Sequence, residues 1–232
     1  MNHWKSLVMI REKRMRVENI LFQLDISWKL FLDHVKDLTD DEALWCKEQN
    51  GLQIQFLNGK WQVDHSQNDK YHESASAAWM IWYTIYWWRK VLDHSFGEGK
   101  LNIEDVQWSG SVKQSIEEVD YLHDQWIKKL SGLTLEQLQS KQYTKWPFSN
   151  RSFYDLALWV NTELMKSAVM IGTCRYFYKI SKDTSENGKK ILEYYNEVGS
   201  VYSIEPPIPQ DLMKVMNVPV TLMYANPATN QF

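Results

Sequence analysis

The chain has little of what marks a secreted, disulfide-stabilised or membrane-spanning protein. Its two cysteines, Cys46 and Cys174, lie far apart and form no C-x-x-C pair. This usage argues against a disulfide framework and is typical of a reducing compartment, so we expect a cytoplasmic location. No apolar run is long enough to cross a bilayer, and the run 7–10 is too short for the core of a signal peptide. The sequence therefore predicts no membrane partner.

The chain also has no large excess of either charge, and proline is scarce before residue 202. The formal net charge is -3 and the basic residues are scattered among the acids. A chain of this kind has no general attraction for nucleic acid, which excludes that class of partner. Five of the six prolines fall within residues 202–232. We therefore predict that residues 182–232 form a partly irregular C-terminal extension, whose apolar residues could dock as a strap.

Four segments carry apolar residues at the three- and four-residue spacing of amphipathic helices. They lie at about 14–36, 74–94, 112–130 and 152–180. No convincing pattern of strands accompanies them, so the sequence predicts an all-α four-helix bundle. The domain is expected to span 1–181 with its core at about 17–180. The following side chains are expected to share that core: Trp28, Trp82, Trp126 and Val160.

Shorter signals punctuate these helices. Two S/T-x-x-E/Q boxes, at 39–42 and 134–137, predict the starts of short helices. The stretch 50–70 is interpreted as a loop, with a short hairpin around Asn58–Gly59. The second long helix is expected to stop at 96–99, where glycines accept the left-handed conformation of a helix end.

The second helix is unusually aromatic. It places six aromatic residues in the ten positions 79–88. Because each buried ring gains roughly 2 to 3 kcal/mol, the segment must lie in a core or line a deep pocket, and both can hold. The residues that could line such a pocket are Trp79, Trp82, Trp87 and, on the last helix, Trp159.

Three strings resemble the DinB-like superfamily. They are 82–88 with 91–97, then Trp146–Pro147–Phe148, then 159–166. The first is similar to that family's second helix, and the others to the approach to its last helix and to that helix. The resemblance covers roughly 17–178 and implies a four-helix bundle with a long crossover connection, often dimeric. Its members include thiol-dependent transferases, isomerases and proteins assigned as hydrolases.

The resemblance also implies a metal site that this chain lacks in its usual form. Many members hold nickel or zinc with one histidine on the second helix and a His-x-x-x-His pair on the last. The matching positions here are Tyr83, Asn161 and Met165. A phenol, an amide and a thioether are poor ligands for either metal, which prefers imidazole, thiolate or carboxylate. Glu163 lies about 200° around the helix from Asn161 and is expected to face another helix or solvent.

Other chemistry-bearing residues offer weaker alternatives. His94 lies roughly 16 Å along the helix from Tyr83, at the far end of the bundle. His123 falls on the apolar seam of the third helix and is interpreted as a core-edge histidine. His65 and His72 share a polar loop that could fold over the pocket and supply imidazoles. Cys174 is expected to be a buried structural thiol, and the carboxylate pairs to lie at helix starts or exposed faces.

Three hypotheses for function follow. The first is a DinB-like bundle with a degenerate metal site that binds a small molecule or a partner without metal, the pocket lying at Tyr83, Asn161 and Met165. The second is a nickel- or zinc-dependent thiol transferase or hydrolase that recruits the loop histidines. The third is a structural or regulatory homodimer. The sequence names no substrate.

Overall fold

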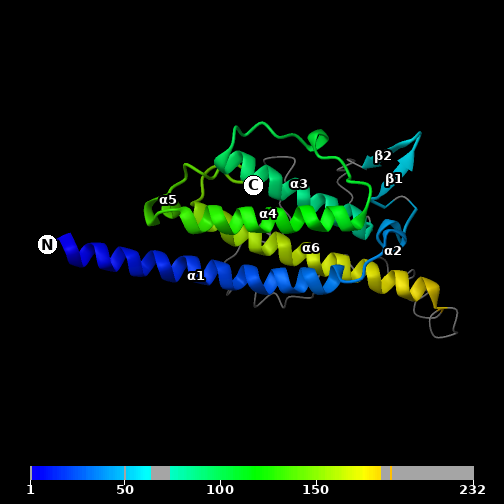
Figure 1. Cartoon of the computed structure of the whole chain (residues 1–232), viewed down its shortest axis with the longest axis horizontal. Helices are drawn as coiled ribbons and strands as arrows, with labels where there is room; N and C mark the ends of the chain where they lie inside the picture. Colours follow the sequence, from blue (N-terminus) through cyan, green and yellow to red (C-terminus); the bar gives the residue numbers. More distant parts are fainter. Residues whose placement is uncertain (1, 50, 64–73, 184–188, 190–232) are drawn as a thin grey trace, which may run out of the picture.

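Four long helices pack as a bundle in the computed structural model, which describes residues 2–49, 51–63, 74–183 and 189 (Figure 1). The bundle helices are α1 (Asn2–Val35), α3 (Ala77–Phe96), α4 (Val112–Gly132) and α6 (Phe153–Lys182). This arrangement confirms the predicted all-α bundle. The predicted C-terminal extension lies outside the described residues, apart from 182–183 and 189.

Serine caps set the starts of three bundle helices. The hydroxyls of Ser76, Ser111 and Ser152 each accept a backbone N–H from the first turn of α3, α4 and α6. Each cap satisfies a donor that has no partner within its helix, which fixes where the helix begins. The first helix is longer than predicted: it begins at Asn2 and not near residue 14. Its described backbone continues through the basic stretch 11–16, where Glu12–Arg16 and Arg14–Glu18 ion pairs favour the helix.

The topology follows from a long crossover. In Figure 1, α1 and α6 run in one direction, whereas α3 and α4 both run in the other. Residues 97–111 therefore travel back along the bundle between α3 and α4, and they include the short 3-10 helix η1 (Ile103–Asp105). Of all element pairs in the described structure, α1 and α6 pack together most extensively. The crossover that the family resemblance implied is present.

Asp93 anchors the start of the crossover. Its carboxylate accepts backbone N–H bonds from Glu98, Lys100 and Leu101, at 3.1, 2.7 and 2.9 Å. The expectation of left-handed glycines holds at Gly99, with φ +72°, but not at the helix cap Gly97, with φ -111°. Gly97 serves a different need, since a Cβ there would lie 2.5 Å from Oδ1 of Asp93.

Short elements surround the bundle. The boxes at 39–42 and 134–137 open α2 (Asp40–Leu44) and α5 (Leu135–Gln139), as predicted. The predicted hairpin is also present: β1 (Ile54–Leu57) pairs antiparallel with β2 (Lys60–Val63) across Asn58–Gly59, both with positive φ. Asp40 ties α2 to the bundle by accepting the N–H of Val112 at 2.7 Å.

The core is built from aromatic and branched side chains of all four long helices. The four residues predicted to share it are all buried: Trp28, Trp82, Trp126 and Val160. Trp82 donates its indole N–H to the carbonyl of Val106 at 2.8 Å, which fastens the crossover to the core. None of the described helices is long and apolar enough to cross a membrane.

Candidate functional site

A continuous set of ring contacts runs along the edge between α3 and α6. We call it the aromatic belt and define it by six residues: Trp79, Tyr83 and Tyr86 of α3, Trp146 and Phe148 of the loop between α5 and α6, and Trp159 of α6. Neighbouring centroids lie 5.1 Å apart for Trp79–Tyr83, 6.1 Å for Tyr83–Tyr86, 6.4 Å for Tyr86–Trp146, 5.6 Å for Trp146–Trp159 and 5.8 Å for Phe148–Trp159. The spacing of 79, 83 and 86 puts these side chains on one face of α3.

Of the four tryptophans that were predicted to line a pocket, two belong to the aromatic belt and two to the core. Trp82 and Trp87 are fully buried and belong to the core. Trp79 and Trp159 are half-buried, as are Tyr83 and Phe148. The aromatic segment of α3 thus has one face packed in the core and another at a partly exposed edge of the bundle.

Tyr83 faces an acidic residue of α6. Its ring stacks on Trp79, and burial, followed by the charge of Glu163, raises the pKa of its phenol far above the ordinary value. Tyr83 is therefore a neutral phenol at physiological pH. The Glu163 side chain is only 12% exposed and forms an ion pair with Lys166. A partly buried carboxylate thus lies at one end of the belt.

Asn161 and Met165 do not share that environment. The Nδ2 of Asn161 donates to the carbonyl of Ile20 at 2.9 Å, so its side chain bonds the backbone of α1. Its Oδ1 has no hydrogen-bond partner among the described residues, which excludes a bond from the Tyr83 hydroxyl. Met165 lies one turn later on the same face of α6 and is half-buried. Asn161 and Tyr83 therefore share no hydrogen bond in the described structure, and the convergence of Met165 on them stays a prediction.

The pair on α6 that faces α3 is Trp159 and Glu163. Trp159 contacts Trp87 of α3 with centroids 6.0 Å apart, and Glu163 acts on Tyr83. These two residues are spaced i, i+4, two positions before the pair Asn161 and Met165 that was expected from the sequence. The spacing along α6 already indicated that Glu163 and Asn161 face different neighbours, because two residues along a helix lie about 200° apart around its axis.

The residues at this edge do not fit a nickel or zinc ion. The cluster offers one carboxylate, a phenol that stays protonated and an indole, whereas these metals bind imidazole, thiolate or several carboxylates. Within the described parts of the chain, no group of three or more histidine, cysteine, aspartate or glutamate side chains could hold a metal. His65 and His72 lie outside the described residues. No chemical step through a metal follows from this arrangement.

At its other end the belt carries a cation. Lys90, one turn after Tyr86 on α3, donates to the Tyr86 hydroxyl at 2.9 Å and lies 5.1 Å from the centroid of Trp146. His94 follows one turn later, with its ring 6.5 Å from that of Trp146. Sequence reasoning set His94 aside as distant from Tyr83 and passed over Lys90. Their i, i+4 spacing after Tyr86 was the available signal.

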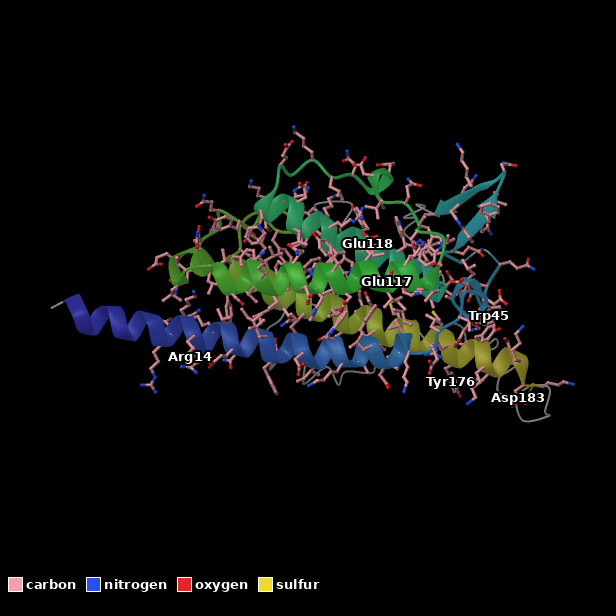
Figure 2. The ribbon with its side chains drawn as sticks, in the orientation of Figure 1. Arg14, Trp45, Glu117, Glu118, Tyr176 and Asp183 are labelled. Atoms are coloured by element: carbon pink, nitrogen blue, oxygen red, sulfur yellow. The ribbon has the colours of Figure 1, made fainter. Side chains whose placement is uncertain are left out.

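The other residues considered as site candidates pack or pair within the bundle. His123 is buried as expected and stacks on Trp28 with centroids 4.1 Å apart. Cys174 is buried, and its thiol bonds the carbonyl of Ala75 at 3.1 Å. Glu118, half-buried on α4, departs from the expected exposed face because it pairs with Arg89 of α3 at 2.5 Å (Figure 2).

The bundle, its crossover and the position of this edge define a helical protein of the DinB type. The sequence model of the DinB superfamily matches residues 23–166, and the chain belongs to that superfamily. No curated protein and no solved structure gave a match.

Proposed function

We propose that this DinB-superfamily bundle binds a small organic molecule along the aromatic belt, without metal chemistry. The observation that carries the proposal is the set of rings in contact between α3 and α6, with Glu163 at one end and Lys90 at the other. Tyr86 and Trp146 are buried, and the other four rings of the belt are half-buried. Ligand sites in proteins are mostly apolar and aromatic, with a few polar groups that orient the ligand. The belt has this composition, and Glu163 and Lys90 are the groups that would orient the ligand.

A neutral fluorescent probe tests this proposal. N-phenyl-1-naphthylamine brightens when it enters an apolar site, so we expect saturable binding to the parent protein. Tyr83→Ala and Trp159→Ala should weaken that binding about tenfold each, since stacking against a ring contributes about 1 to 1.5 kcal/mol. Tyr121→Ala, which removes an exposed tyrosine of α4, is the matched control. Unchanged binding in both belt variants would refute the proposal.

A metal measurement separates the competing enzyme hypothesis. A nickel- or zinc-dependent transferase or hydrolase would have to recruit ligands such as His65 and His72. Protein purified without a histidine tag is expected to contain far less than one equivalent of either metal. Nickel or zinc at near-equal stoichiometry, lost in a His65→Ala/His72→Ala variant, would favour the enzyme.

Self-association is a second candidate function, and an exposed stripe on α1 favours it. Met15, Phe22 and Ile26 lie on one face of the helix and are 56%, 67% and 45% exposed. The charges flanking the stripe change sign along the helix. Residues 11–18 carry four basic and two acidic side chains, a net charge of +2, whereas residues 25–37, at the end of α1 and just after it, carry three acidic and two basic ones, a net charge of -1. Two antiparallel copies of α1 would therefore bring opposite charges together.

The self-association candidate has a direct test. We expect the parent protein to sediment as a dimer and Phe22→Glu to sediment as a monomer, because a buried, unpaired carboxylate opposes association. Arg14, labelled in Figure 2, borders the stripe, and Arg14→Glu should weaken the dimer in a salt-dependent way. A monomeric parent protein at high concentration would remove this candidate.

A further inference from the structure

Among the residues that the structure describes, Lys90 lies against the belt without forming an ion pair with a carboxylate. Its ammonium group donates to the Tyr86 hydroxyl at 2.9 Å and lies 5.3 and 5.1 Å from the centroids of Tyr86 and Trp146. The ion pairs formed among the described residues do not include it. An ammonium has three donors, and the contacts above use one for a hydrogen bond.

Neighbouring residues behave differently. Arg89, the preceding residue, pairs with Glu118 at 2.5 Å, and Lys166 at the other end of the belt pairs with Glu163. The cation that precedes Lys90 and the one at the other end of the belt are thus each neutralised by a carboxylate. Lys90 forms no such pair among the described residues.

The surroundings of Lys90 are themselves positively charged. Burial first, and then the charges of Lys90 and Lys145, lower the pKa of His94, against which Asp93 acts in the opposite direction. The Asp93 carboxylate is occupied by backbone N–H groups of the crossover. This end of the belt therefore combines a half-buried ammonium, a second lysine and a histidine around the ring of Trp146.

We propose that Lys90 binds the acidic group of the ligand, so that the belt takes an organic anion with an apolar or aromatic body. The inference rests on the proposed function of the belt and adds the chemical class of its ligand. The acidic group, a carboxylate, phosphate or sulfonate, accepts the unused N–H donors of Lys90. The apolar body lies along the half-buried rings of Trp159 and Phe148, which pack beside the buried ring of Trp146, and Glu163 at the far end opposes a second acidic group there.

A matched pair of probes tests the class. The compounds 8-anilinonaphthalene-1-sulfonate and N-phenyl-1-naphthylamine share one aromatic body and differ in the sulfonate. We expect the parent protein to bind the anionic probe about fivefold more tightly, the effect of one partly exposed charge pair. The preference should shrink as salt is added. Lys90→Gln should abolish the preference while the neutral probe still binds, and Lys90→Arg, which keeps the charge, should restore it.

The control is Lys129→Gln, because Lys129 lies 5.4 Å from the ring centroid of Phe96 and beside a separate surface cavity of about 400 Å³. It is expected to leave the preference unchanged. Equal binding of the two probes by the parent protein, or a preference that survives in Lys90→Gln or is lost in Lys129→Gln, would overturn the role of Lys90 and leave the proposed function standing. If neither probe binds the parent protein, both fail. Far-ultraviolet circular dichroism checks that each variant is folded.

Discussion

At the scale of single residues, the most informative side chain is Tyr83, whose hydroxyl has no hydrogen bond with Asn161. We expect Tyr83→Phe to change the free energy of unfolding by less than about 1 kcal/mol, because no buried partner is left unsatisfied. Urea denaturation measures this change. A loss of about 1 to 3 kcal/mol would instead show that Tyr83 and Asn161 form a buried pair in solution.

His123 is the residue that makes the bundle sensitive to mild acid. It packs between Trp28 of α1 and Trp88 of α3, and burial lowers its pKa although Asp124, Asp120 and Asp25 oppose the shift. The unfolded state, with an ordinary pKa of about 6.5, then binds the proton first. Stability is therefore full above about pH 6.5 and falls as the pH drops toward the lowered folded pKa.

The measurement is urea denaturation between about pH 7 and 5. His123→Phe keeps a ring against Trp28 and should flatten the pH dependence of the free energy of unfolding. His94, whose pKa is also lowered, contributes a slope of the same sign, so His94→Gln is the comparison. An equally steep slope in His123→Phe would contradict the assignment.

At the scale of elements, the contact between α1 and α6 depends on a glycine. A Cβ at Gly172 would lie 2.5 Å from Cε1 of His34, so the imidazole ring of α1 packs directly on the Gly172 backbone of α6 and would have to move. Gly172→Ala should lower the free energy of unfolding by about 1 to 3 kcal/mol, as overpacking does. Gly132→Ala is the control, since a Cβ there meets nothing within 4 Å and alanine favours a helix. Equal effects in the two variants would contradict the close approach.

The start of the crossover depends on hydrogen bonds to the carboxylate of Asp93. Burial raises the pKa of this carboxyl, but backbone N–H donors of Leu101, Gly99, Lys100 and Glu98 outweigh it, and the net shift is downward. Asp93→Ala should cost about 1 kcal/mol at neutral pH, a modest value because the site is solvated. Since the folded pKa lies below the unfolded one, this contribution is present above about pH 4 and disappears as the pH falls through the folded pKa. The difference between parent and variant should therefore vanish in strong acid.

At the scale of the whole molecule, the sequence predicted the bundle well because apolar spacing and caps are local signals. The serine caps of α3, α4 and α6, and the hairpin at Asn58–Gly59, all lie where short-range rules place them. The site was harder to predict, because it depends on which side of α6 faces α3. The sequence assignment chose Asn161 and Met165, whereas the contacts in the structure bring Trp159 and Glu163 toward α3. The polar bond from Asn161 to Ile20 could not be foreseen from spacing alone.

The pairing of α1 with α6 has a consequence for synthesis on the ribosome. The two helices that pack most extensively are the first and the last of the bundle. At about 5 to 20 residues per second, α6 is completed roughly 7 to 30 seconds after α1. During that time Ile20, Leu24 and Phe31, all buried in the finished protein, lack the helix that covers them. Nascent α1 is therefore a natural client for a chaperone, and the bundle can close only when translation of α6 is complete.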